Sequence, residues 1–141
     1  PTILLFETPQ ACLRIDSIIA LGGFESIHIG LNDLKIALEL DFMFETLSSG
    51  FVEFITSKLK KELIPFGFGG IARLGNGILG SDKILQEHFR LGSSRVILSR
   101  DFKQIFDLFN NQQAKETFKS EVEKCREYWQ SISLYEKNFL E

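Results

Sequence analysis

Residues 2–9 read TILLFETP, and residues 25–34 read ESIHIGLNDL. Each stretch is a short apolar run, typical of a buried strand, that ends in polar residues able to start a helix. Similar runs occur at residues 64–69 and 95–99, and helical spacing follows each of them. Four strand-helix units in succession predict an α/β fold with a parallel sheet and right-handed crossovers.

The helices between these strands are predicted from apolar spacing and from capping residues. They are expected over residues 9–21, a short stretch after residue 32, and residues 44–63, 81–89, 102–109 and 112–139. The predicted caps are Thr8 before Pro9, Asn32 or Asp33, Ser81, and a capping box formed by Asp101 and Gln104.

The last predicted helix carries one apolar seam at steps of three and four residues, formed by Phe118, Val122, Cys125, Trp129 and Ile132. The seam predicts either a helix that lies across its own domain or one that packs on another subunit. We therefore expect two parts, an α/β body over residues 1–110 and a helical extension over residues 111–141.

Composition excludes several partners. The 141 residues carry a formal net charge of -3, which gives no reason to expect nucleic acid or an anionic membrane. The longest apolar runs stay far below the roughly 20 residues of a membrane helix. Cys12 and Cys125 have no CxxC partner, so both are expected to be buried thiols of a protein in a reducing compartment, the cytoplasm.

The chemistry is expected at the carboxyl ends of the strands, where loops and helix N-termini meet in parallel architectures. Glu7 ends the first predicted strand, and Asp33 follows the second by three residues. Two carboxylates at neighbouring strand ends suit a hard divalent cation, which prefers oxygen ligands. For each acid alone, a helix-capping or surface carboxylate is the alternative interpretation.

Two further features of the sequence are better explained by a structural role than by ligand binding or catalysis. Residues 67–72 match a relaxed dinucleotide fingerprint, but glycines continue to Gly80 and the next helix is expected only near Ser81, which disfavours nucleotide binding. His28 alternates with Ile27 and Ile29 on its strand, and a satisfied structural histidine is the expectation.

Roughly residues 2–102 of the chain resemble the HpcH/HpaI aldolase and citrate lyase family, most specifically around Glu7 and Asp33. The resemblance rests on LFETPQA at residues 5–11, Ile15-Asp16, Gly22-Gly23-Phe24 and IGLNDL at residues 29–34. It implies that the chain is the C-terminal half, strands five to eight, of a TIM (β/α)₈ barrel with a long C-terminal helix. It also implies that Glu7 and Asp33 hold a catalytic Mg²⁺ or Mn²⁺, and that backbone N–H groups of Leu31, Asn32 and Asp33 hold a substrate carboxylate.

The implied reaction is carbon-carbon bond cleavage by a lyase or aldolase acting on a 2-oxo acid such as pyruvate or on an acyl-CoA thioester. Members of the family take a substrate arginine and a general base from the first half of the barrel, which this sequence does not contain. Arg73, in the glycine-rich loop after the third strand, is a candidate catalytic residue that the family pattern does not assign.

A half barrel also needs a covering partner. We expect either the missing N-terminal half-barrel or a second copy, in a homo-oligomer, because open sheet edges favour association. The alternative function is a non-catalytic binding or regulatory half-barrel module.

Overall fold

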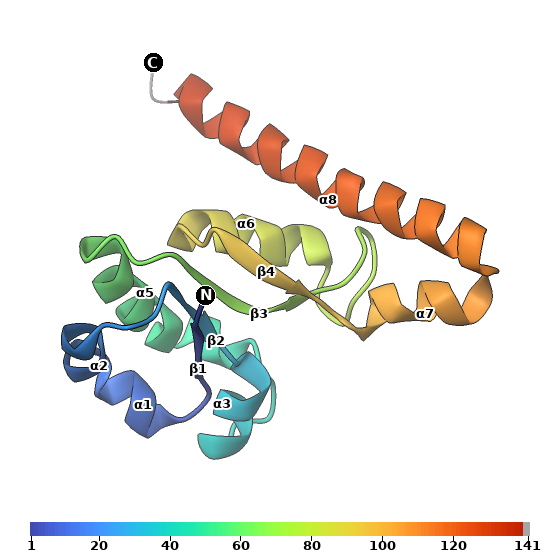
Figure 1. The fold of residues 1–141 in the computed structure, drawn as a ribbon. Helices are drawn as coiled ribbons and strands as arrows, with labels where there is room; N and C mark the ends of the chain where they lie inside the picture. The colour runs from blue at the N-terminus through green and yellow to red at the C-terminus, as the bar shows by residue number, and fades with distance from the viewer. Residues whose placement is uncertain (140–141) are drawn as a thin grey trace. The chain divides into compact units, whose positions relative to one another are not determined.

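The computed structural model describes residues 1–139, and its centre is one sheet of four strands (Figure 1). The strands are β1 (Ile3–Phe6), β2 (Ser26–Ile29), β3 (Phe66–Ile71) and β4 (Arg95–Leu98), in the order β1-β2-β3-β4. β1 pairs parallel with β2, and β2 pairs parallel with β3. The predicted α/β class with a parallel sheet is confirmed.

Helices connect the strands and follow the last of them. Within residues 1–139 they are α1 (Pro9–Leu13), α2 (Ile15–Leu21), α3 (Leu31–Ala37), α4 (Glu45–Ser48), α5 (Phe51–Lys61), α6 (Ser81–Leu91), α7 (Arg100–Leu108) and α8 (Asn111–Phe139). In this part of the chain no helix combines the length and the apolar character that crossing a membrane requires.

The chain divides into two compact units. Unit 1 comprises Pro1–Gly69 and Leu91–Val96, and unit 2 comprises Gly70–Arg90 with the chain from Ile97 onward. The extension predicted from residue 111 begins where α8 begins, and α8 belongs to the same unit as α6 and α7.

Unit 1 has a core between one face of its strands and its helices. Phe6, Ile27, Ile29, Phe66 and Phe68 point from the strands into this core, and each is at most 2% exposed. The helices contribute Cys12, Ile15, Leu31, Leu34, Val52, Ile55 and Leu59. Burial of about a dozen large apolar side chains, each giving roughly 1.5–3 kcal/mol, is the main stabilising term of this unit.

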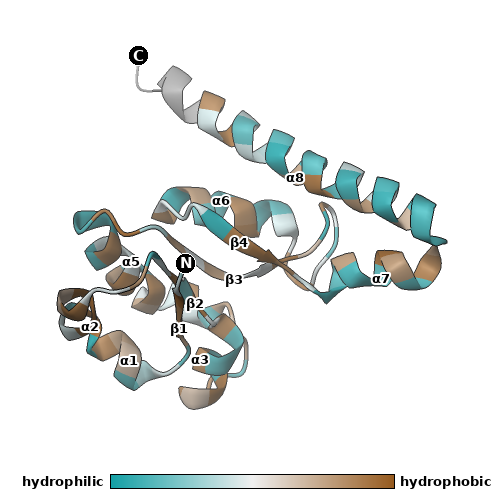
Figure 2. Ribbon diagram, in the orientation of Figure 1, coloured by the Kyte–Doolittle hydropathy of each residue, from teal (hydrophilic) through white to brown (hydrophobic). Residues whose placement is uncertain are grey.

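Unit 2 is held together by aromatic contacts along α8. The Phe118 ring packs against those of Phe102 and Phe106 on α7, with centroids 5.8 Å and 5.6 Å apart. Trp129 contacts Phe89 of α6 edge-on at 5.5 Å, and Cys125 is buried. The apolar seam of α8 thus lies against its own unit, and the remainder of the helix surface is mostly hydrophilic (Figure 2).

Two helices that the sequence predicts as continuous are broken. The helix expected over residues 9–21 is divided at Arg14, which ends α1 and begins α2. The helix expected over residues 44–63 is divided near Gly50, whose left-handed φ of 79° interrupts the helix between α4 and α5. A single amphipathic pattern across both halves does not reveal the break, because both halves pack on the same core.

Three predicted caps are also wrong. Neither Asn32 nor Asp33 caps α3, which begins at Leu31 after Gly30. Ser81 is the first residue of α6, one position after the expected cap, and its hydroxyl donates to the Arg73 carbonyl at 2.8 Å. Ser99 caps α7 by accepting from the Asp101 N–H, so the Asp101–Gln104 capping box does not form. The Thr8 cap is confirmed, since its Oγ1 accepts from the Ala11 N–H at 3.2 Å.

Candidate metal site and the Asp101 cluster

Glu7 follows the last residue of β1, at the carboxyl edge of the sheet. The parallel register pairs Phe6 with Ile29, and the Gly30 N–H donates to the Phe6 carbonyl at 2.9 Å. This bond carries the β1–β2 pairing to the point where both strands end. Glu7 is half-buried and lies beside the start of the loop that leads into α3.

Gly30 makes room for the Glu7 side chain. A Cβ added at Gly30 would lie 2.7 Å from Glu7 Cγ and 3.1 Å from Glu7 Oε1. The φ of Gly30 is -81°, which any residue can adopt, so the requirement for glycine is one of space alone. The carboxylate of Glu7 is therefore turned toward the end of β2 instead of away from it.

Asp33 stands in the first turn of α3, two residues into the helix that follows β2. Its side chain is exposed, as is that of Asn32, whereas Leu31 is 2% exposed and belongs to the core. Glu7 and Asp33 thus follow the carboxyl ends of two adjacent parallel strands. An acid in the first turn of a helix is also stabilised by the helix dipole.

Metal-ligating side chains do not gather in larger groups. Among the side chains that the structure describes, those of residues 1–134, no three or more from histidine, cysteine, aspartate or glutamate are placed to share an ion. A site built on Glu7 and Asp33 would have two protein carboxylates, and water or substrate would fill the other positions. Mg²⁺ sites with one or two carboxylates and several waters are of this kind.

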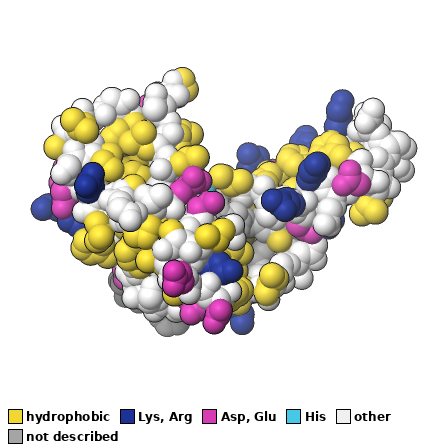
Figure 3. Space-filling view, turned by 90° about the horizontal axis from the view of Figure 1, so that it is seen from below, with side chains coloured by type: hydrophobic (Ala, Val, Ile, Leu, Met, Phe, Trp, Pro, Cys, Tyr) yellow, Lys and Arg dark blue, Asp and Glu magenta, His cyan; other side chains and the backbone are white. Residues whose placement is uncertain are grey.

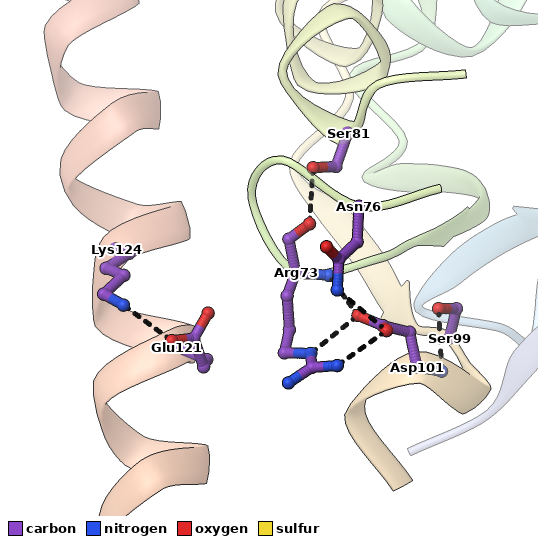
Figure 4. A network of polar contacts seen from close by, with 7 residues as sticks. All are labelled: Arg73, Asn76, Ser81, Ser99, Asp101, Glu121 and Lys124. Carbon is purple, nitrogen blue, oxygen red and sulfur yellow. Dashed lines mark hydrogen bonds and ion pairs between the residues drawn. The ribbon is translucent and has the colours of Figure 1, made fainter. Parts of the chain in front are cut away.

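Arg73 is held by an aspartate of unit 2 (Figure 4). Its Nε donates to Asp101 Oδ2 at 2.8 Å, and its Nη2 donates to Asp101 Oδ1 at 2.9 Å. The Arg73 backbone N–H also donates to Oδ2, and the Asn76 amide donates to Oδ1 at 3.0 Å. We call Arg73, Asn76, Ser81 and Asp101 the Asp101 cluster.

The cluster fixes the loop between β3 and α6. Four donors converge on the Asp101 carboxylate, and the Arg73 guanidinium is the first cause that holds its pKa at about 2. The same contact raises the pKa of Arg73. Bidentate, charge-assisted pairs of this geometry are the stronger class of ion pair. The forked contact with Asp101 thus gives Arg73 the role of a loop anchor.

His28 is 8% exposed and hydrogen-bonds with the backbone of Gly69. Burial lowers its pKa, and the bond to Gly69 opposes that shift in part. Both thiols are buried, as expected, and burial raises the pKa of Cys12 to about 11. The hydrogen-bonded histidine and the two buried thiols agree with the structural interpretation of these residues.

Comparison with protein-family models, with curated proteins and with solved structures finds no match to this chain. The interpretation of the site therefore depends on the geometry of this chain alone. Sequence reasoning named Asp101 only as a helix cap and missed its ion pair with Arg73, because the two residues are 28 positions apart and no local pattern joins them. It also missed the role of Gly30, for which the only signal is a glycine directly after an apolar strand.

Proposed function

We propose that this chain is the metal-binding half of a (β/α)₈ barrel of the HpcH/HpaI aldolase and citrate lyase type. In this proposal the four strands are the last four of the barrel, and the complete protein is a lyase or aldolase of the cytoplasm. The observation that supports it is the position of Glu7 and Asp33 after adjacent parallel strands, with Gly30 leaving room for the Glu7 side chain.

In the proposed site Glu7 and Asp33 hold Mg²⁺ or Mn²⁺ through carboxylate oxygens. The bound ion would supply charge stabilisation for the enolate that forms when a carbon-carbon bond next to a 2-oxo acid or an acyl-CoA thioester breaks. Backbone N–H groups of Leu31, Asn32 and Asp33 would orient the substrate carboxylate. Arg73 would contribute by holding the loop after β3 in place.

Metal binding tests the proposal directly. Mn²⁺ bound to the 141-residue chain is measured by electron paramagnetic resonance and by calorimetry, for the native protein and for Glu7→Gln and Asp33→Asn. Each substitution keeps the side-chain size and removes one charged ligand, so each should weaken Mn²⁺ affinity by about tenfold or more. Asp107→Asn, an exposed acid on α7, is the matched control and should bind as the native chain does.

Equal Mn²⁺ affinity in all four proteins would refute the assignment of Glu7 and Asp33. If the native chain binds no divalent ion at millimolar concentration, the alternative of a non-catalytic binding or regulatory module gains support. Cleavage of oxo acids and of acyl-CoA thioesters is then assayed with the complete protein, where the two substrate classes can be compared.

A further inference from the structure

The surface of the molecule contains one dipeptide with a chemistry of its own. Figure 3 shows hydrophobic, acidic and basic side chains interspersed on one face, and scattered apolar side chains of this kind are ordinary. The loop between β3 and α6, in contrast, contains Asn76-Gly77, which is the only Asn-Gly pair of the sequence. Both residues are exposed, so water reaches them.

The loop requires glycine at position 77. The φ of Gly77 is 104°, a conformation that residues with a side chain rarely adopt. A Cβ added there would also lie 2.7 Å from the Leu79 carbonyl oxygen. Within residues 1–134, whose side chains the structure describes, the Gly77 N–H donates no hydrogen bond. Its backbone nitrogen is therefore neither shielded by a side chain nor engaged with another group of these residues.

Asn76 is held through both its side chain and its backbone. Its Nδ2 donates to Asp101 Oδ1 at 3.0 Å, within the Asp101 cluster (Figure 4). Its backbone N–H donates to the Arg73 carbonyl at 2.9 Å, and its carbonyl accepts from the Ser81 N–H at 3.2 Å. A chemical change at Asn76 would therefore affect the Asp101 carboxylate and the start of α6 together.

An asparagine followed by glycine is prone to deamidation, because no side chain hinders attack by the following backbone nitrogen. The Gly77 nitrogen loses its proton to water and forms a bond to Asn76 Cγ, and the Cγ–Nδ2 bond breaks with release of ammonia. The product is a five-membered cyclic imide. Water then opens either side of the ring and gives aspartate or isoaspartate. Overall one water is consumed, the amide nitrogen leaves as ammonium, and the chain gains one carboxylate.

We propose that Asn76 is a deamidation site, that the Asp101 cluster slows the reaction, and that the product opens the cluster. While its amide donates to Asp101, the Asn76 side chain is restrained. After deamidation a second carboxylate replaces the donor, and like charges at this distance repel. In isoaspartate the chain also runs through the former side chain, which displaces the carbonyl that accepts from Ser81. This inference does not depend on the metal proposed at the carboxyl edge of the sheet.

The reaction is followed in the folded 141-residue chain at mildly alkaline pH and physiological temperature. Peptide mass spectrometry detects the exchange of the amide NH₂ for OH, and chromatography separates the aspartate peptide from the isoaspartate peptide. We expect both products to accumulate at Asn76 several-fold faster than at Asn111. Asn111 is the control within the same molecule, because it is exposed at the start of α8 and precedes Gln112.

Asp101→Asn tests the restraint, because it removes the charged acceptor of the Asn76 amide. A hydrogen bond to a charged group lowers the population of the free amide by roughly three- to tenfold, and deamidation should become faster by that factor. Phe118→Ala is the matched control, since it weakens unit 2 without removing a hydrogen-bond partner of Asn76. It should accelerate the reaction less than Asp101→Asn, and circular dichroism checks that both variants are folded.

Two substitutions at position 76 test the effect of the product. Asn76→Asp carries the aspartate product from the outset, and Asn76→Ser removes the amide donor without adding a charge. Urea unfolding should give a lower midpoint for Asn76→Ser than for the native chain, and the lowest midpoint for Asn76→Asp. Asn111→Asp adds the same charge outside the cluster and should keep the native midpoint.

Equal rates of deamidation at Asn76 and Asn111 would overturn the proposed site. If Asp101→Asn accelerates the reaction no more than Phe118→Ala does, the cluster does not restrain Asn76. A native urea midpoint for Asn76→Asp would overturn the opening of the cluster, and equal midpoints for Asn76→Asp and Asn76→Ser would overturn the role of charge repulsion.

Discussion

The substitution Asp101→Asn tests whether the Asp101 cluster stabilises unit 2. Asparagine has nearly the same shape as aspartate, so the packing around it is preserved. It lacks the negative charge, however, and its amide nitrogen cannot accept from Arg73 or Asn76. We therefore expect Asp101→Asn to lower the free energy of unfolding without changing the fold.

The magnitude follows from the pKa of Asp101, which is about 2 compared with an ordinary value of 3.8. One pKa unit corresponds to about 1.4 kcal/mol, so the full shift would correspond to about 2.5 kcal/mol. The side chains of Arg73 and Asp101 are 20% and 19% exposed, and water that reaches them screens part of the attraction. We expect a loss of about 1–2 kcal/mol at neutral pH.

The pH dependence has a definite sign. Because the pKa is lowered in the folded protein, the stabilisation is present above the ordinary pKa and is lost as pH falls toward 2. Roughly half of it should remain at about pH 3. The difference in unfolding free energy between native protein and Asp101→Asn should therefore shrink between pH 6 and pH 3.

Urea unfolding followed by circular dichroism at both pH values measures this difference. Asp16→Asn is the matched control, because Asp16 pairs with Lys58 at 2.6 Å but is 72% exposed. Exposed pairs contribute little, so this variant should lose at most about 0.5 kcal/mol. Equal losses in the two variants at pH 6, or a loss in Asp101→Asn that is the same at pH 3, would refute the reasoning.

Three further predictions concern the core and the carboxyl edge. Gly30→Ala should push Glu7 aside, and Mn²⁺ titration should show weaker binding while thermal unfolding shows a loss of only about 1 kcal/mol. Cys12 has a pKa of about 11 and is fully buried, so a thiol reagent at pH 8 should modify it only when urea unfolds unit 1. Phe118→Ala should lower the free energy of unfolding, measured by calorimetry, by about 2–3 kcal/mol, because Phe118 contacts two rings of α7. The control Leu134→Ala, at a side chain that is 63% exposed, should change it by less than about 0.5 kcal/mol.

The strands were predictable because each is a local apolar run of the right length, and only β3 is displaced, beginning at Phe66 after Pro65. The break at Gly50 was not predicted, because the apolar pattern on both sides of it serves one core and continues through the glycine. Local patterns describe which face of a segment is buried. They do not report whether the segment is straight.

The polar residues of the candidate sites also fall into two groups, those that the sequence predicts and those that it does not. Glu7 and Asp33 could be selected from sequence because Glu7 directly follows a strand and Asp33 stands in the first turn of the helix after the next strand. The pairing of these two strands places their carboxyl ends side by side. The contact of Arg73 with Asp101 could not be predicted from the sequence, because it joins a loop to a helix in another part of the chain. The sequence predicts that the Asp101 carboxylate caps a helix together with Gln104. In the structure this carboxylate accepts hydrogen bonds from Arg73 and Asn76 instead, because Arg73 brings a positive charge and the two residues together bring more donors.

The division of the chain into two units has a consequence for biosynthesis. The polypeptide passes from one unit to the other after Gly69, again after Arg90, and again after Val96. Unit 1 therefore lacks Leu91, Ser93 and Arg95 until residues 70–90 have already been made, and a ribosome that stops at residue 69 releases a unit without its last strand. Domains commonly fold in the order of synthesis, but here each unit is made of two separate segments of the chain, so neither is completed by one uninterrupted stretch of translation. For the same reason, no single proteolytic cut separates one intact unit from the other.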